Sequence, residues 1–423
     1  MLDILFELEK NNKNIKTAIL GAGRMGRAIF YQCSITPGLD CIGISDIKIE
    51  KAIDTAKMFG FEYKIIYNEH ELEHCVRNNI IAICEDGILL SDYEPLDVFT
   101  DASTEIVDAV NIDALALNNG THLVMMNAEA DLTFGPYLNN IAQRNKLVYT
   151  TCDGDQPGVI KRIVDEIELW GFKAIMLGNI KGFLDYYSNP TKIIPEADKR
   201  KLEYKMCTAF TDGTKVNIEM SLLANALDGR VLKSGMNGIR MEKVTDVFKH
   251  YDFEQLNNCG LVVEYILGAT PKGGVFVVGY CGNDFQQDLL NYLTSGTIAR
   301  GDFNLFYRPY HLCHIESVRT IIEATLNNKS LLKPNFGFKT NVIAYAKRDI
   351  KEGEILDGIG GYLCYGLIEN IDKSNNDQGL PICIADKILV KNDIKKDHKI
   401  YMKDVHFDKR RSDFKYYELS QTI

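Results

Sequence analysis

Along the first part of the chain, apolar runs typical of buried strands alternate with segments in which apolar residues recur at helical spacing. The run "IKTAIL" at 15–20 is apolar enough for a buried strand, and the next segment has the spacing of an amphipathic helix. The same succession continues with further apolar strands and polar-faced helices. The predicted strands are 80–84, 97–103, 122–126 and 146–151, and the predicted helices are 105–120 and 136–144. This alternation predicts a mostly parallel sheet with helices on both faces over residues 1–150.

The remainder of the chain has a different pattern. A loop, "DGDQP", leads into a helix, "KAIMLGNI" at 173–180 predicts a strand, and a helix is expected from about Lys215. Residues 151–338 are therefore predicted to be an α+β substrate domain. From 339 to 423, short apolar runs broken by Lys-Glu-Gly and Lys-Lys-Asp turns predict a small β-rich domain.

A glycine-rich turn follows the first predicted strand. Gly21, Gly23 and Gly26 form G-x-G-x-x-G between strand and helix, which is typical of a loop that holds a pyrophosphate at a helix N-terminus. Asp46 ends the second strand 20 residues after Gly26, the spacing of an acid that binds a ribose 2′-hydroxyl. The arrangement predicts a Rossmann-type, doubly wound domain that prefers NAD. Lys48 keeps NADP possible, because it could reach a 2′-phosphate; a solvated lysine is the alternative.

Ligands of such sheets bind beyond the carboxyl ends of the strands, so "TDASTE" and "MNAEAD" should border the nicotinamide. The predicted cofactor-binding residues lie in the glycine turn and at these strand ends. They are Gly21, Gly23, Arg24, Met25, Gly26, Asp46, Ala102, Ser103 and Asn127.

Composition narrows the possible partners. The chain has 423 residues and a net charge of −10, with no long basic run, which argues against nucleic acid and anionic membranes. No apolar run of membrane-spanning length is present, and "MLDILFELEK" has acids where a signal peptide needs basic residues. We therefore expect a cytoplasmic protein, acting on a small-molecule substrate as a homo-oligomer.

Eleven cysteines are scattered singly, so they are interpreted as small apolar residues rather than a disulfide framework. Cys313 and His314 are adjacent in the sequence. Neighbours on a strand point to opposite faces, so a shared metal or a nucleophile–base pair is not expected there.

Four stretches together resemble a known family: "THLVMMNAEADLTFGPYL", "FTDGTKVNIEMSLLANA", "NLFYRPYHL" and "AYAKRDIKEGEILDGIGGY". They are similar to homoserine-dehydrogenase-like oxidoreductases with a C-terminal SAF (antifreeze-like) domain. One branch is the 1-deoxy-D-xylulose 5-phosphate reductoisomerase-like enzymes of isoprenoid biosynthesis. The resemblance implies a hydride-transferring enzyme, and this branch implies NADPH and a divalent metal, Mg²⁺ or Mn²⁺.

The chain departs from this branch at several positions. Asp46 stands where a 2′-phosphate would be accommodated, "GDQPGV" at 154–159 replaces a "GDEPSS"-like loop, and only Lys181 remains of a glycine-lysine-rich turn. Ala128 and Glu129 follow Asn127 where homoserine dehydrogenases carry a lysine, so homoserine itself is not expected as substrate.

Carbonyl reduction needs a group that polarises the oxygen and supplies a proton. Lys181, after the strand at 173–180, is the first candidate, and an exposed turn lysine is the alternative. Lys215 is the second; it shares a helix face with Glu219, and a surface ion pair is the other interpretation. Carboxylates expected on loops near the cofactor could grip substrate hydroxyls or a metal ion. They are Glu129, Asp131, Asp153, Asp155 and Glu219, with Asp155 also a possible helix cap.

Arg308 and His311 lie among aromatic residues in "FYRPYHL". The guanidinium could clamp a phosphate or carboxylate and the imidazole could bond a hydroxyl. Stacking of Arg308 on Tyr307 or Tyr310 is the alternative.

The sequence therefore predicts an NAD(P)-dependent oxidoreductase that acts on a small polar carbonyl or alcohol, phosphorylated or polyhydroxylated. A reductoisomerase-like enzyme is one alternative, and a protein that binds NAD(H) without turnover is another. The β-rich domain is predicted to pack beside the substrate domain and to shape the cleft or a subunit contact.

Overall fold

The computed structural model describes all residues except 297, 373–377, 407, 409 and 423. Contacts group the chain into two compact units. The first unit contains residues 1–158, 312–333 and 416–423, and the second contains 159–311 and 334–415.

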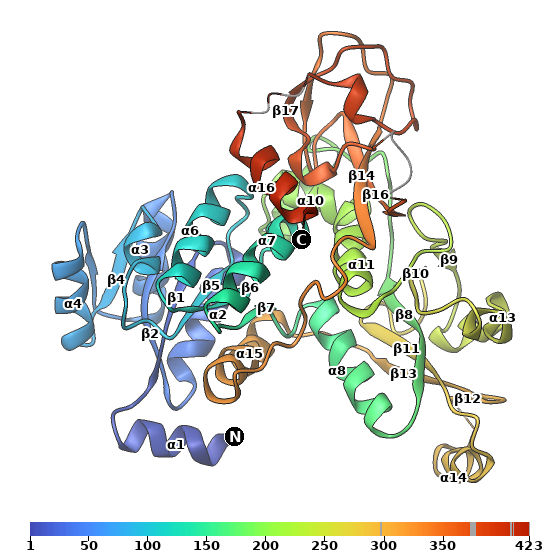
Figure 1. Ribbon diagram of the computed structural model, residues 1–423, viewed down its shortest axis with the longest axis horizontal. Coiled ribbons are helices and arrows are strands. Elements are labelled where there is room, and N and C mark those ends of the chain that lie inside the picture. The colour runs from blue at the N-terminus through green and yellow to red at the C-terminus, as the bar shows by residue number, and fades with distance from the viewer. Residues whose placement is uncertain (297, 373–377, 407, 409, 423) are drawn as a thin grey trace. The chain divides into compact units, whose positions relative to one another are not determined.

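A seven-stranded parallel sheet forms the centre of the first unit, as the periodicity predicted (Figure 1). Its strand order is β3-β4-β2-β1-β5-β6-β7. The strands are β1 (Ile15–Leu20), β2 (Leu39–Ser45), β3 (Tyr63–Ile65), β4 (Ile81–Cys84), β5 (Val98–Asp101), β6 (His122–Met125) and β7 (Tyr149–Thr151). The helices are α1 (Leu2–Lys10), α2 (Arg24–Ile35), α3 (Ile49–Phe59), α4 (Glu69–Arg77), α5 (Ile88–Ser91), α6 (Val107–Asn118) and α7 (Ala128–Arg144). The chain order reverses between β1 and β5, so this Rossmann-like sheet has its ligand-binding switch point there.

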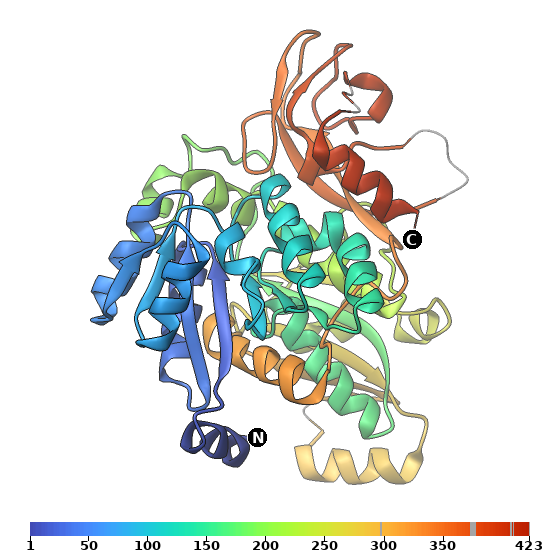
Figure 2. The same cartoon turned by 60° about the vertical axis from the view of Figure 1, so that its left-hand side comes forward.

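Helix α15 (Cys313–Asn327) packs against α2 and β1 of the same unit, where the orange helix lies beside the blue elements in Figure 2. Ile321 and Ile322 of α15 belong to the core that also contains Ile19 and Ile29. The strand expected at Cys313 and His314 is therefore wrong. The Glu316 carboxylate accepts the backbone N–H of Leu312 at 3.0 Å and so caps the start of a helix.

The second unit is built on a six-stranded mixed sheet of order β12-β13-β11-β8-β10-β9. Its strands are β8 (Lys173–Lys181), β9 (Ile239–Arg240), β10 (Val262–Leu267), β11 (Val275–Tyr280), β12 (Ala299–Arg300) and β13 (Phe303–Arg308). The helices are α9 (Ile194–Arg200), α10 (Tyr204–Thr211), α11 (Thr214–Leu227), η1 (Val244–Asp246), α12 (Val247–His250), α13 (Phe253–Asn257) and α14 (Asp284–Thr294). Helix α8 (Gln156–Leu169) contains the boundary between the units.

Two antiparallel strand pairs complete the second unit. They are β14 (Thr340–Ala346) with β16 (Cys364–Asn370), and β15 (Ile355–Asp357) with β17 (Asp386–Leu389). Short 3₁₀ helices, η2 (Ile382–Ile384) and η3 (Met402–Asp404), lie between and after them. We call residues 339–406 the β-module. Its strands β14 and β16 pack on α11, whose other contacts include β10 and β8 (Figure 1).

Packing on two sides buries α11 from Thr214 to Ala226, including polar side chains such as Asn217 and Glu219. The boundaries at 150 and 338 stay predictions about separable domains; in the packing, the β-module belongs with α11. The small β-rich domain expected over 339–423 also contains a helix, α16 (Ser412–Gln421), where Phe414 and Tyr417 are buried. Among the described residues, no helix has both the length and the apolar character needed to cross a membrane.

Candidate functional site

The glycine turn between β1 and α2 has three different backbone environments. Gly21 adopts a φ of +95°, a left-handed conformation that favours glycine, and packs against Ala102 and Ser103. A Cβ on Gly26 would lie 1.8 Å from the carbonyl oxygen of Gly21, so α2 can approach the turn only without one. A Cβ on Gly23 would meet nothing within 4 Å. Gly23 is thus the open position in front of the α2 N-terminus, and the turn fits a pyrophosphate there. Arg24 is exposed and Met25 half-buried at this end.

Asp46 follows β2 beside the same turn. One carboxylate oxygen accepts the N–H of Ala22 at 2.8 Å and the other accepts that of Lys48 at 2.9 Å. Each oxygen keeps a further lone pair for a ribose hydroxyl. The carboxylate therefore orders the turn and also fits an adenosine ribose with a free 2′-hydroxyl.

Asn127 joins the strand ends on the other side of the switch point. Its amide donates to Asp101 Oδ2 at 2.9 Å, to Ser103 Oγ at 3.2 Å and to the carbonyl of Glu105 at 2.6 Å. Its carbonyl oxygen accepts the N–H of Ala130 at 3.1 Å and caps α7. Ser103 and Asn127 thus lie together, and Ala102 contacts the glycine turn, as expected for loops at one sheet edge.

Asp101, at the end of β5, is a buried carboxyl at the same edge. Burial raises the pKa of its carboxyl from 3.8 to about 6, against hydrogen bonds from Ser103 and Asn127 that lower the pKa. We did not single it out from the sequence. The available signal was its position as the acid that ends an apolar strand, which it shares with Asp46.

The carboxylates expected on loops are distributed differently. Glu129 and Asp131 lie in the first turns of α7, because this helix begins earlier than the helix expected near 136–144. Glu219 lies within α11, the helix expected from about Lys215. Asp131 accepts the hydroxyl groups of Tyr149 and Thr151 and supports the core. Asp153 Oδ1 accepts the N–H of Gly154 at 2.8 Å. Asp155 Oδ1 lies 3.8 Å from the Cys313 sulfur.

A metal site formed by these groups alone finds little geometric support. Among the described residues of the first unit, no three of Glu129, Asp131, Asp153 and Asp155 bring oxygens within 4.8 Å of one another. The carboxylate oxygens of Asp131 and Asp153 also already accept hydrogen bonds from other groups of the protein.

The second unit brings two of the candidate catalytic residues together. Lys181 ends β8 and its ammonium lies 3.5 Å from Glu219 Oε2 on α11. Asn179, two residues earlier on the strand, lies 3.3 Å from the same oxygen. Glu219 is 1% exposed and the Lys181 side chain 17%, so this pair is largely shielded from solvent. Lys215 is buried on the same helix, so a pair of Lys215 with Glu219 would not lie at the surface.

Arg308 ends β13 at the edge where Lys181 ends β8. Both Arg308 and Asn179 are paired with Val275 on the intervening strand β11, which places Arg308 two strands away from β8. The guanidinium carbon lies 4.6 Å from the centre of the Tyr310 ring, which is the stacking alternative. His311 follows in the connection to α15.

One segment in the middle of the chain is similar to a known protein family. Residues 154–317, which are less than half of the chain, match a family model. That model is described as oxidoreductase DRL, catalytic domain, and the matched residues include Lys181, Lys215, Glu219 and Arg308. No curated protein sequence matches the chain.

The chain is also similar to three solved oxidoreductases. One is a myo-inositol dehydrogenase from Corynebacterium glutamicum, with 10% identity over 70% of this chain and 75% of that chain, and a TM-score of 0.39. Another is 1-deoxy-D-xylulose 5-phosphate reductoisomerase from Zymomonas mobilis in complex with NADPH, with 9% identity, 75% and 82% coverage and a TM-score of 0.38. A third is DOX-P reductoisomerase in complex with NADPH, fosmidomycin and magnesium, with 15% identity and a TM-score of 0.35. That match covers 49% of this chain and about half, 56%, of the reductoisomerase.

Proposed function

We propose that this protein transfers a hydride between NAD(H) and a small polar carbonyl or alcohol substrate. The observation that carries the proposal is the shielded pair of Lys181 and Glu219, 3.5 Å apart, within the segment that matches an oxidoreductase catalytic domain. The substrate class we propose is a phosphorylated or polyhydroxylated compound, and the protein is expected to work as a cytoplasmic homo-oligomer.

The cofactor proposal rests on the glycine turn. Open space at Gly23 and the N–H groups at the start of α2 would receive the pyrophosphate, and Asp46 would bind the ribose hydroxyls. When bound, the nicotinamide supplies or accepts the hydride. A carboxylate repels a 2′-phosphate, so NAD is proposed over NADP, which Lys48 keeps possible.

Lys181 is proposed to act as the proton donor in reduction. Its ammonium would hydrogen-bond the substrate oxygen, stabilise the negative charge that develops there and give up a proton as the alcohol forms. Glu219 would hold the ammonium in place, and Asn179 would hold Glu219. Lys215 is proposed as a second cation on the same helix. Arg308 would bind a substrate phosphate or hydroxyl-bearing end through its planar fork, with His311 near it in sequence.

A reductoisomerase-like reaction is the alternative that requires a divalent cation. Asp153 and Asp155 flank Gly154 in the "GDQPGV" segment and are carboxylates of the type that Mg²⁺ binds. The Asp153 oxygen that accepts the Gly154 N–H would have to bind the ion through its other lone pairs.

The deciding experiment is a screen of phosphorylated sugars, ketoses and keto acids for oxidation of NADH and NADPH, with and without Mg²⁺. Steady oxidation that Lys181→Ala abolishes would support the proposal. Tight NADH binding without turnover of any carbonyl compound would instead identify a dinucleotide-binding sensor. Turnover that requires Mg²⁺ and rearranges the carbon skeleton would favour the reductoisomerase alternative.

A further inference from the structure

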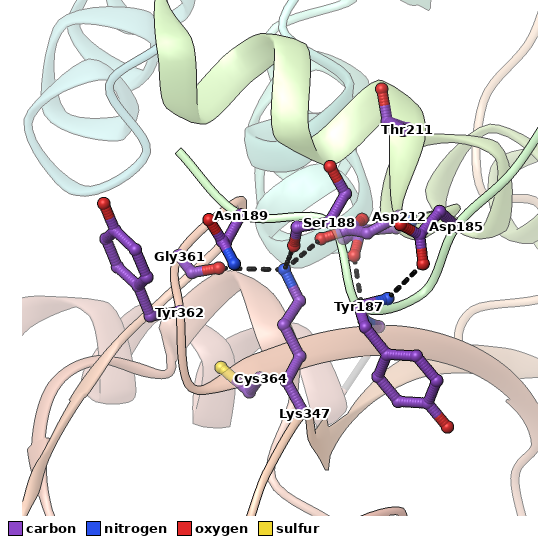
Figure 3. Close-up of polar contacts among 12 residues, drawn as sticks. Asp185, Tyr187, Ser188, Asn189, Thr211, Asp212, Lys347, Gly361, Tyr362 and Cys364 are labelled. Atoms are coloured by element: carbon purple, nitrogen blue, oxygen red, sulfur yellow. Dashed lines mark hydrogen bonds and ion pairs between the residues drawn. The ribbon is translucent and has the colours of Figure 1, made fainter. Parts of the chain in front are cut away.

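A buried lysine lies outside the segment that matches the catalytic domain. Lys347 follows β14 in the β-module, and its side chain is 3% exposed. Its ammonium donates to three oxygens, each at 2.8 Å: the Ser188 carbonyl, Asp212 Oδ2 and the Gly361 carbonyl (Figure 3). An ammonium has three N–H donors, so all of them are satisfied.

Two of these acceptors belong to segments that carry the candidate catalytic residues. Ser188 is in the loop 182–192, which directly follows Lys181 at the end of β8. Asp212 comes shortly before α11, the helix with Lys215 and Glu219. Both segments meet at one atom, Lys347 Nζ. Asp185 of the loop also donates its N–H to the Thr211 carbonyl at 2.8 Å, so the two segments are joined directly as well (Figure 3).

The β-module holds the loop at two further places. The Tyr187 hydroxyl lies 2.9 Å from both oxygens of Asp397, and the Lys396 ammonium lies 3.7 Å from the centre of the Tyr187 ring. The Thr191 hydroxyl lies 2.8 Å from that of Tyr362. These contacts are exposed and individually weak, whereas the Lys347 contact is buried.

The β-module also fixes the start of α11. Asp212 Oδ1 accepts the Thr214 N–H at 2.9 Å, and the Thr214 hydroxyl accepts the Gly366 N–H at 2.9 Å. One turn on, Asn217 Oδ1 accepts the Ile368 N–H at 2.9 Å. Side chains of α11 thus accept the backbone N–H groups of β16 that a neighbouring strand would otherwise accept.

We propose that Lys347 is a positioning residue of the active site. The Lys347 ammonium hydrogen-bonds the loop after Lys181 and the segment before α11 at the same time. It thereby holds Lys181 of β8 and Glu219 of α11 at the distance of 3.5 Å that the structure shows. This inference rests on the proposed function, because it assigns the β-module a role in the same reaction. It predicts that the module acts on turnover without touching substrate.

A stability-only role makes a different prediction. Buried ion pairs can often be replaced by apolar residues without loss of stability, whereas removing one partner leaves a buried charge. A double variant, Lys347→Met with Asp212→Asn, removes both charges, while the amide oxygen of the new side chain can still accept the Thr214 N–H. If Lys347 serves stability alone, a folded double variant should keep the wild-type kcat.

The test compares three proteins with wild type: Lys347→Met, the double variant, and Lys351→Met as a control. Lys351 is in the same module and pairs with Asp393 at the surface, with 66% and 53% of the side chains exposed. Hydrogen–deuterium exchange should rise in 182–192 and at the start of α11 for both Lys347 variants. We expect kcat to fall at least tenfold, the NADH dissociation constant to stay within twofold, and the control to match wild type. Lys347→Arg, which keeps the charge, should recover part of kcat.

Two results would overturn the inference. One is a folded double variant with wild-type kcat and wild-type pH profile, and the other is unchanged exchange in both segments. If Lys347→Met and the double variant do not fold, Tyr187→Phe and Asp397→Asn can be used, because each weakens the contact between the loop 182–192 and the β-module. These variants should raise hydrogen–deuterium exchange in the loop and lower kcat. A wild-type protein without turnover would defeat the proposed function, while the exchange measurement would still decide whether Lys347 fastens the two segments.

Discussion

Gly26 lies so close to Gly21 that a Cβ on Gly26 would come within 1.8 Å of the Gly21 carbonyl oxygen. The helix α2 and the turn before it are therefore in backbone contact. Gly23, between them, has no atom within 4 Å of the position its Cβ would take. The same motif thus contains Gly26, which the packing of α2 requires, and Gly23, which leaves open space in front of the helix.

The pair Gly26→Ala and Gly23→Ala should separate folding from cofactor binding. Gly26→Ala should lower the free energy of unfolding by several kcal/mol, because backbone rather than a flexible side chain must move. Gly23→Ala should keep the melting temperature near that of wild type and weaken NADH binding at least tenfold, because the new methyl group occupies the pyrophosphate position. Thermal unfolding and NADH titration measure the two effects. If Gly23→Ala binds NADH with wild-type affinity, the pyrophosphate does not bind at this turn.

Asp46→Ser should narrow or reverse a preference for NAD(H) over NADP(H). The serine removes the charge that repels a 2′-phosphate, and it also removes the acceptor of the Ala22 and Lys48 N–H groups. Asp46→Asn is the matched control, because it is neutral and keeps an acceptor oxygen. Titration of both cofactors measures the preference. A wild-type protein that favours NADPH tenfold, about 1.4 kcal/mol, would contradict the assignment of Asp46.

Lys181→Ala should lower kcat by at least a hundredfold and leave NADH affinity nearly unchanged, since the ammonium is needed where negative charge develops on the substrate oxygen. Glu219→Gln should have a smaller effect of the same kind, because the amide can still accept from Lys181. Steady-state kinetics on the substrate found by the screen measure both. Near-wild-type turnover of Lys181→Ala would transfer the role to Lys215 or to a metal ion.

Asp131 should make the protein less stable as the pH rises. Burial raises the pKa of its carboxyl from 3.8 to about 6, so between these values the folded protein holds a proton that the unfolded chain has lost. The contribution to stability is present below about pH 4 and falls by about 3 kcal/mol by pH 7. Asp131→Asn should show a smaller slope, because Asp101, whose pKa burial raises in the same way, still contributes, and the exposed Asp54→Asn should keep the wild-type slope. Urea unfolding from pH 4.5 to 7.5 compares them; parallel curves for Asp131→Asn and wild type would contradict the assignment.

Local patterns in the sequence predict much of the first unit. Alternation of strands and helices, the three glycines and Asp46 depend on short-range spacing, and the parallel sheet and the turn geometry agree with them. The position of α15 in this unit could not be predicted in the same way. Cys313–Asn327 is amphipathic in its own right, and the core it joins is formed by residues far away in the sequence.

The candidate site was predictable only in part, for the same reason. Lys181 stood out because it ends a strand between glycines, and Glu219 because it shares a helix face with Lys215. That Lys181 and Glu219 meet depends on how α11 packs on β8, which periodicity does not specify. Lys347 is 135 positions from Asp212, and in sequence it is an ordinary charge after an apolar run.

The first unit is assembled from three separate stretches of chain, 1–158, 312–333 and 416–423. During synthesis, β1 and α2 leave the ribosome long before α15, whose Ile321 and Ile322 cover part of their core. A nascent chain that ends before residue 312 therefore exposes an apolar face that the native unit buries, and such surfaces attract chaperones and favour aggregation. The unit that contains β1 and α2 is thus completed only after residues 312–333 and 416–423 have been synthesised.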